Sequence, residues 1–227
     1  MENDFIQGQR FKSITDYVWA PTPKAKDLWA IGDYDNLQGN FNNLTVKMLA
    51  EDRPVSVYTH GIYAREMLKE LGKFDKKFVV VTHNSDEPID DSYDIPPNVV
   101  RWFAQNVATD NHRVESIPIG LENDMWGQHW HPPVDKKAIL EEKMKEDKHY
   151  RDLVYMNFNP ATAPIKRDVV WEMFKDKPWV TARRGSNFSD FDNYITNVRH
   201  HKFVLCPEGN GMDTHRTWET LYRGNIS

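Results

Sequence analysis

The chain has 227 residues, of which 39% are hydrophobic and 28% charged, so it can build one large folded domain or two small ones. Its formal net charge of −5 argues against a general nucleic-acid binder, because such proteins carry a basic surplus on one face. Cys206 is the single cysteine, which excludes an internal disulfide and a cysteine-rich zinc site and predicts a reducing, cytoplasmic setting.

The amino-terminal segment, MENDFIQGQRF, has neither the basic region nor the apolar stretch of a signal peptide. No apolar run approaches the roughly 20 residues of a membrane-spanning helix. We therefore expect this sequence to be neither secreted nor anchored in a membrane, although a soluble piece of a longer, anchored protein would fit the same pattern. Residues 1–27 lack periodicity and contain Pro21 and Pro23, so they are predicted to form an irregular arm.

Short β-branched and aromatic runs then alternate with helix-like stretches. We expect strands over 28–31, 55–58, 78–82, 99–103 and 114–119, and a helix over 62–71 with Gly72 as its C-cap. A charged helix over 135–148 is predicted to connect two halves, 1–133 and 151–227, across residues 134–150. The second half repeats the pattern, with strands over 153–157, 179–182 and 202–206 and helices over 166–174, 189–198 and 215–223.

The helix over 189–198 has the clearest signal of these elements. Ser189 can cap it, and Phe191, Tyr194, Ile195 and Val198 recur at the spacing of one helical face. Alternating strands and helices of this kind predict an α/β protein with mostly parallel sheets covered by helices.

The segment after Cys206 has the features of a phosphate-binding loop. Gly209 and Gly211 allow close approach of the backbone, and Asp213 or Thr214 can cap a helix that begins near His215. In open α/β sheets, ligands bind at such loops, where the N–H groups of a helix start are free.

At 100° per residue, one face of that helix carries the polar side chains and is predicted to look outward, while the other packs. The outward set is His215, Arg216, Glu219 and Arg223, and the packing set is Trp218, Leu221 and Tyr222. Arg216 is suited to a diphosphate and Glu219 to ribose hydroxyls. The alternative is an ordinary surface helix with an Arg/Glu pair.

The sequence PEGNGMDTHRTWETLYRGNI resembles the donor-binding signature of exostosin-like glycosyltransferases, family 47 and its bacterial and viral relatives. The fragments FVVVTHNSD, WFAQN and IPIGLEN, and a strand ending in NF before a helix near Arg167, resemble the same group. Members of that family normally continue beyond the G-x-I of the motif into a further strand and helices. Here the sequence stops at Ser227, so the resemblance leaves two expectations: a truncated carboxyl-terminal domain, or a compact variant whose last strand is missing or supplied otherwise.

The resemblance implies a GT-B fold, in which two Rossmann-like domains face a cleft and the second binds the donor. It implies a nucleoside-diphosphate sugar, with a UDP-sugar favoured, an oligosaccharide or polysaccharide acceptor, no required metal or other cofactor, and a bacterial or viral context. By motif position, Glu219 is the ribose-binding acid and Arg216 the diphosphate ligand. The remaining donor-binding residues are expected to be Asn157, Lys166, Arg167, Pro207, Gly209, Asn210, Gly211, Asp213 and His215.

Inverting transfer also needs a general base for the acceptor hydroxyl. The candidates follow strands of the first half: His60, His83 and Asp86. For each of them a structural hydrogen-bonding role is an equal alternative. Glu122 and Asn123 are predicted to line the acceptor cleft, although a turn stabilised by Asn123 explains them as well.

Two other functions fit parts of the sequence. Asp33 and Asp35, or Asp190 and Asp192, form D-x-D patterns like those that hold a metal ion in GT-A glycosyltransferases. A non-catalytic domain that binds a nucleotide sugar or a glycan is the second alternative. The pairs His129/His131 and His200/His201 lack a third ligand at a spacing typical of zinc sites, so we expect no metal there.

Overall fold

The structure is a computed structural model that describes residues 5–21, 49–124, 133–185 and 190–227. It divides into two compact units. The N-terminal unit is Gly8–Pro118, and the C-terminal unit combines Met1–Gln7 with Ile119–Ser227. Each unit is an α/β structure with a parallel sheet, as the sequence predicted.

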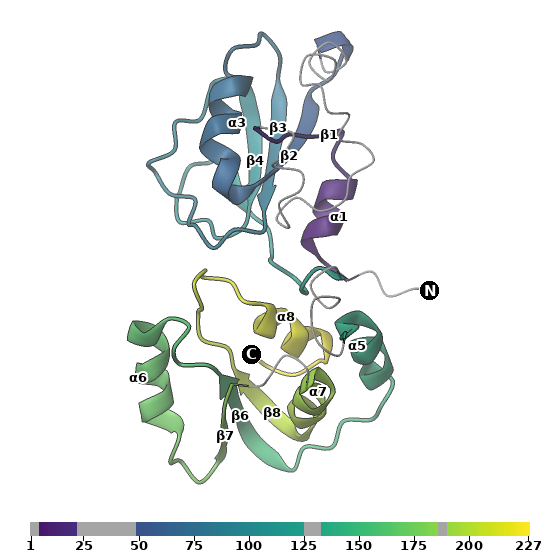
Figure 1. Cartoon of the computed structure of the whole chain (residues 1–227), viewed down its shortest axis with the longest axis vertical. Helices are drawn as coiled ribbons and strands as arrows, with labels where there is room; N and C mark the ends of the chain where they lie inside the picture. The colour runs from purple at the N-terminus through teal and green to yellow at the C-terminus, as the bar shows by residue number, and fades with distance from the viewer. Residues whose placement is uncertain (1–4, 22–48, 125–132, 186–189) are drawn as a thin grey trace. The chain divides into compact units, whose positions relative to one another are not determined.

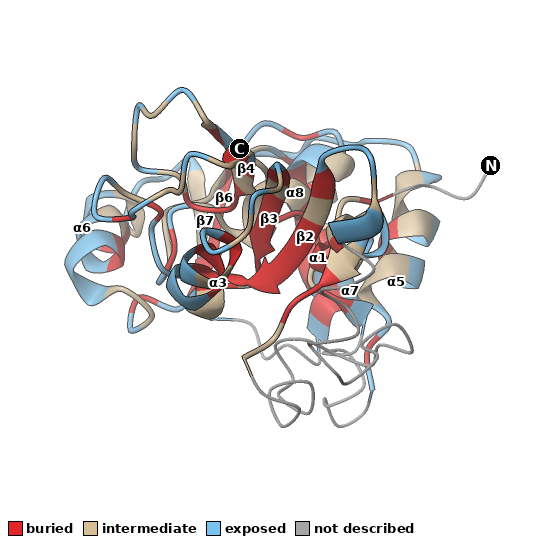
Figure 2. Cartoon of the chain, turned by 90° about the horizontal axis from the view of Figure 1, so that it is seen from above, coloured by how far each residue is buried: buried red, intermediate tan, exposed pale blue. Residues whose placement is uncertain are grey.

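The N-terminal unit contains a five-stranded parallel sheet in the order β1-β2-β3-β4-β5. Its strands are β1 (Tyr17–Val18), β2 (Val55–His60), β3 (Phe78–His83), β4 (Val99–Ala104) and β5 (Val114–Ser116). Its helices are α1 (Gly8–Ser13), the 3₁₀ turn η2 (Gly61–Tyr63) and α3 (Ala64–Leu71). Figure 2 shows β2 and β3 as largely buried strands.

Both faces of this sheet are covered because neighbouring residues of a strand point to opposite sides. Val57 packs with Met67 and Leu68 of α3, whereas Tyr58 packs with Phe11 of α1. Strands buried on both faces need continuous apolar runs, which is why 78–82 was recognisable.

The start of the chain differs from the predicted irregular arm. Residues 8–13 form α1, and Tyr17 and Val18 pair with Val57 and Tyr58 as an edge strand. A two-residue strand has no periodicity of its own, so only its pairing partner reveals it. Strand β5 ends at Ser116 rather than at residue 119, because Pro118 has no N–H to donate to the hydrogen bonds between strands. The strand predicted over 28–31 lies outside the described residues.

The C-terminal unit contains a three-stranded parallel sheet in the order β7-β6-β8. Its strands are β6 (Asp152–Phe158), β7 (Val180–Arg184) and β8 (His201–Leu205). Its helices are α5 (Lys136–Met144), α6 (Pro164–Phe174), α7 (Phe191–His200) and α8 (His215–Tyr222). The side chains that α7 was predicted to bury, at positions 191, 194, 195 and 198, are all buried. Ser189 lies outside the described residues.

The helices lie on opposite faces of this sheet (Figure 1). Met156 and Phe158 pack with Trp171 of α6, while Tyr155 and the buried side chains of α7 form the core on the other face. Helices α5 and α8 join α7 on that second face through Leu140 and Tyr222.

The helix predicted to connect two halves is therefore a packed part of the C-terminal unit. Asp135 caps α5 by accepting a hydrogen bond from the backbone N–H of Ala138 at 2.9 Å, and Leu140 is fully buried. The unit also begins earlier than the predicted boundary at residue 133. Its first segment is fixed by the bridge between Gln7 and Leu121 and by the hydrogen bond from Leu121 N to Ile6 O at 2.8 Å.

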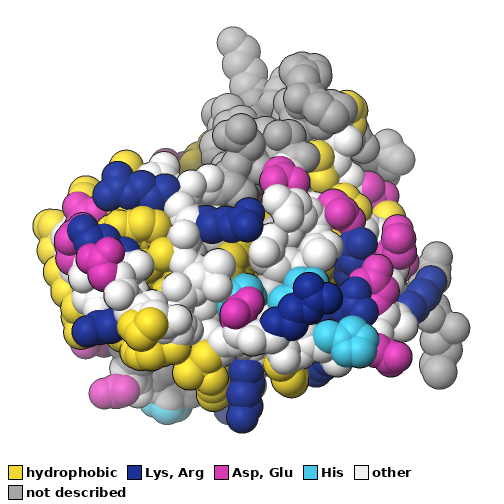
Figure 3. Space-filling view, turned by 90° about the horizontal axis from the view of Figure 1, so that it is seen from below, with side chains coloured by type: hydrophobic (Ala, Val, Ile, Leu, Met, Phe, Trp, Pro, Cys, Tyr) yellow, Lys and Arg dark blue, Asp and Glu magenta, His cyan; other side chains and the backbone are white. Residues whose placement is uncertain are grey.

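Helix α6 has apolar side chains on both sides. Trp171 faces the sheet, whereas Ile165, Val169 and Met173 recur every four residues and are exposed by 89%, 57% and 57%. Hydrophobic side chains are visible at the surface on the side where α6 lies (Figure 3). None of the helices in the described ranges has the length and apolar character needed to span a bilayer.

Candidate functional site

The order of strands in the C-terminal unit creates one position for a ligand. The chain goes from β6 to β7 on one side, then crosses back to β8 on the other side of β6. The loop after β6 leads to α6 on one face, and the loop after β8 leads to α8 on the opposite face. A crevice outside the carboxyl ends of β6 and β8 is where open α/β sheets bind ligands.

Arg167 is the first cation near the carboxyl ends of β6 and β8. Its side chain is buried, and its guanidinium donates to the backbone carbonyls of Glu208, Asn159 and Pro207 at 2.8, 3.2 and 3.5 Å. Burial and the nearby charge of Arg216 lower the pKa of Arg167 to about 10. The carbonyls fix the orientation of this cation without neutralising its charge.

Arg216, in the first turn of α8, is the second cation. Its Cζ lies 5.7 Å from the ring centroid of Tyr194. Within the described part of the chain, its buried Nε has no hydrogen-bond partner and its guanidinium forms no ion pair. Two guanidiniums that repel each other, with no carboxylate paired to either among the described residues, are chemically suited to binding an anion.

The loop between β8 and α8 closes around these cations. Its backbone is held by a hydrogen bond from Gly209 N to Gly211 O at 3.0 Å. A Cβ at Gly209 would lie 3.0 Å from Nη2 of Arg167, so glycine at this position permits the close approach of that guanidinium. Pro207 accepts from Arg167, and Asn210 at the tip is exposed. Thr214 occupies the N-cap position of α8, as one of the two predicted caps, but its side chain makes no capping hydrogen bond.

Glu219 lies one turn further along α8 and is buried, with 5% of its surface exposed. Its Oε1 lies 3.5 Å from Lys136 Nζ, and the same ammonium lies 3.1 Å from Oε2 of Glu122. Burial alone lowers the pKa of Lys136, but Glu219 and Glu122 outweigh burial and raise it. Glu122, predicted for the acceptor side, therefore belongs to the same cluster as Glu219.

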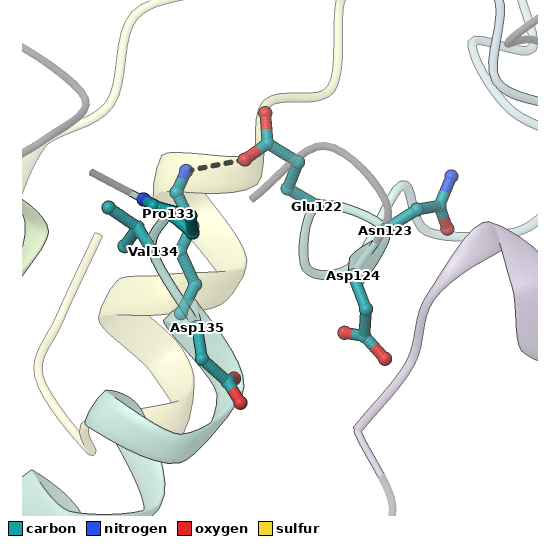
Figure 4. Close-up of a pocket in the computed structure, with 7 residues that line it drawn as sticks. Glu122, Asn123, Asp124, Pro133, Val134 and Asp135 are labelled. Atoms are coloured by element: carbon teal, nitrogen blue, oxygen red, sulfur yellow. Dashed lines mark ion pairs between the residues drawn. The ribbon is translucent and has the colours of Figure 1, made fainter. Parts of the chain in front are cut away.

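A cavity of about 200 Å³ lies beside this cluster and is lined by residues 122–124 and 133–136. Figure 4 shows the carboxylate of Glu122 pointing at the ammonium with which it pairs, while Asn123 and Asp124 point elsewhere. Asn123 is buried.

Asn157 adds a buried acceptor near the end of β6. Its Nδ2 donates to Tyr155 OH at 2.7 Å, while its Oδ1 is buried without a partner within the described residues. Tyr155 and Asn157 face the side of α7, since alternate residues of a strand share a face. The ring of Tyr155 lies 6.1 Å from that of Tyr194, the residue beneath Arg216.

Other residues predicted to bind the sugar donor make hydrogen bonds or ion pairs with the protein itself. Asp213 accepts from the indole N–H of Trp218 at 2.8 Å and from Ile119 N at 2.7 Å, which fixes the start of α8. His215 Nδ1 donates to Gly120 O at 2.8 Å, because a carbonyl can only accept. The exposed Lys166 forms an ion pair with Glu208.

The predicted faces of α8 are right in part: Tyr222 packs against the core as predicted, but members of both sets depart from the prediction. Glu219 and Arg223 are buried, whereas Leu221, assigned to the packing face, is 46% exposed. These polar side chains can be buried because each has a partner. Glu219 forms an ion pair with Lys136, and Arg223 donates a hydrogen bond to the backbone carbonyl of Glu146 at 3.2 Å.

The candidate bases lie at strand ends of the N-terminal unit. His60 is 2% exposed, and burial lowers its pKa to about 4. Both ring nitrogens of His83 face oxygens, Nδ1 that of Asn84 at 2.9 Å and Nε2 that of Pro118 at 3.0 Å. Asp86 is exposed.

Asp33, Asp35, His129 and His131 lie outside the described residues. Asp190 accepts from Asn193 at 2.8 Å, and Asp192 pairs with Lys143 at 3.3 Å. Among the residues described, no group of three His, Cys, Asp or Glu side chains is arranged to hold a metal ion.

Sequence reasoning missed Lys136, which pairs with Glu122 and Glu219, and Tyr155, whose hydroxyl accepts from Asn157. The signal for Lys136 was a cation directly after a capping aspartate, at the helix end where positive charge is unfavourable. The chain matches no protein-family model and no curated protein.

Proposed function

We propose that the protein is a glycosyltransferase that moves a sugar from a nucleoside-diphosphate sugar to an oligosaccharide or polysaccharide acceptor. The observation that carries the proposal is the pair Arg167 and Arg216, unpaired with carboxylates among the described residues, beside a glycine loop at the strand crossover. The resemblance of residues 207–226 to the donor motif of exostosin-like enzymes adds the substrate class. The proposal includes a GT-B arrangement of two Rossmann-like domains.

The donor diphosphate would bind where the two guanidiniums and the first N–H groups of α8 converge. Negative charge grows on the diphosphate as the sugar bond breaks, and fixed cations stabilise that charge. Two arginines can do this without a metal ion, so EDTA should leave activity unchanged. Glu219 would accept hydrogen bonds from ribose hydroxyls.

The acceptor hydroxyl needs a base in the N-terminal unit. Asp86 fits this role best of the three candidates, because its carboxylate is exposed while both imidazoles are buried. The low pKa of His60 makes it a weak base, and both nitrogens of His83 are already engaged. Asp86→Asn should then abolish transfer and leave donor binding intact.

A calorimetric screen against UDP, GDP, dTDP and their sugars tests the donor site. One nucleotide diphosphate should bind the wild type, and Arg216→Ala and Glu219→Ala should weaken it at least tenfold, about the effect of one charge-assisted hydrogen bond. Arg101→Ala is the matched control, since Arg101 forms a surface ion pair with Glu115. The proposal would be refuted if the wild type bound no nucleotide, or if both variants bound the nucleotide as tightly as the wild type. Binding without transfer to any glycan would leave a nucleotide-sugar-binding domain instead of an enzyme.

A further inference from the structure

Lys136 occupies a position that is unfavourable for a lysine. It is the first residue of α5, where the helix dipole is positive. Only 11% of its side chain is exposed, and burying an ammonium is costly unless it is paired. Its place in the fold therefore depends on the carboxylates around it.

Three segments of the C-terminal unit meet at this ammonium. Glu122 precedes α5 in the chain, Glu219 comes from α8, and the ring of Phe191 in α7 has its centroid 5.0 Å from Nζ. Lys136 contacts Oε1 of Glu219. Within the described part of the chain, Oε2 of Glu219 accepts no hydrogen bond, so that oxygen is left for a ligand.

Among the residues that the structure describes, the cluster has an excess of negative charge, because the carboxylates of Glu122 and Glu219 both face the ammonium of Lys136. This excess favours hydroxyl donors and disfavours phosphate, which is the opposite of the site formed by Arg167 and Arg216. Glu122 and Lys136 also contribute to the lining of the cavity beside this pair (Figure 4).

We infer that Lys136 is a positioning residue: it holds one oxygen of Glu219 so that the other accepts the ribose hydroxyls of the donor nucleotide. The inference rests on the proposed function and adds a specificity to it. The protein should prefer ribonucleotides to 2′-deoxyribonucleotides, and Lys136 should set the size of that preference.

The test compares the affinities for UDP and 2′-deoxy-UDP, and for GDP and 2′-deoxy-GDP, by calorimetry. The variants are Lys136→Met and the control Lys137→Met, the same change one residue along α5. The wild type should prefer the ribonucleotide by about tenfold, the typical effect of one hydrogen bond to a carboxylate. Lys136→Met should bring the ratio close to one and leave the affinity for inorganic pyrophosphate unchanged. Lys137→Met should behave as the wild type.

Each outcome bears on one claim. A wild type that binds none of the nucleotides overturns the proposed function and this inference with it. A wild type that binds but does not prefer the ribonucleotide, or a folded Lys136→Met with the wild-type ratio, overturns this inference alone. If Lys136→Met shows no cooperative melting, Lys136→Gln replaces it, because its amide is polar enough for the site but carries no charge and ends one atom short of the lysine nitrogen, so it cannot hold Glu219 as the ammonium does. An unchanged ratio in Lys136→Gln overturns the inference as well.

Discussion

Replacing Arg216 by methionine should weaken nucleotide binding while the stability of the fold stays the same or rises. Methionine keeps an unbranched, polarisable chain over the ring of Tyr194. It removes a buried Nε that has no partner among the described residues, and it removes the repulsion with Arg167. We therefore expect unfolding stability to stay the same or to rise by about 1 kcal/mol, a melting shift of roughly 2–4 °C.

Nucleotide binding should change far more than stability. A bidentate contact between a guanidinium and a phosphate contributes about 1.5–3 kcal/mol, so the affinity for UDP should fall by about tenfold to hundredfold. The affinity for uridine, which has no phosphate, should not change. Calorimetry with both ligands and thermal melting of both proteins provide the comparison. A variant that melts earlier but binds UDP as the wild type does would refute the reasoning.

Other changes test separate parts of the structure. Leu221→Ser should alter stability by less than about 0.5 kcal/mol because Leu221 is exposed; a large loss on chemical denaturation would contradict the orientation of α8. Gly209→Ala should weaken pyrophosphate binding severalfold, since its Cβ would displace Arg167, and wild-type affinity would disprove that contact. Because the pKa of His60 is depressed in the folded protein, the unfolded chain binds a proton first as the pH falls. The free energy of unfolding should therefore be unaffected by His60 above pH 6.5 and should fall by about 3 kcal/mol between pH 6.5 and pH 4. His60→Gln should flatten this decline in urea titrations, and a slope equal to that of the wild type would exclude His60 as its source.

The elements predicted best were those whose pattern is local. Phe78 to Thr82 is buried on both faces and reads as one apolar run, and α7 carries its apolar side chains at helical spacing. Elements that depend on distant partners were missed or misjudged. The edge strand at Tyr17 exists because β2 lies beside it, and α5 packs through Leu140, whose burial no charged pattern reveals.

In the candidate site, too, features set by local sequence were predicted and features set by distant partners were not. The glycine loop and Arg216 follow from sequence because one loop and one helix start lie together in the chain. The outward face assigned to Glu219 was wrong, because its counterion, Lys136, is 83 residues away in sequence. Periodicity reports which residues share a face, but only tertiary structure reports whether a polar face has partners inside.

The segment around Ile6 and Gln7 has a consequence for synthesis. It bridges to Leu121, and Ile6 N donates to the hydroxyl of Tyr222 at 2.7 Å, so the unit that carries Arg216 is built from both ends of the chain. A ribosome releases Gly8–Pro118 as one continuous stretch that can fold while translation proceeds. The contact of Ile6 with Tyr222 can form only after α8 has been synthesised. A deletion that removes Ile6 and Gln7 would therefore disturb α8 and the segment at Leu121 in the carboxyl-terminal unit rather than the unit next to it in sequence.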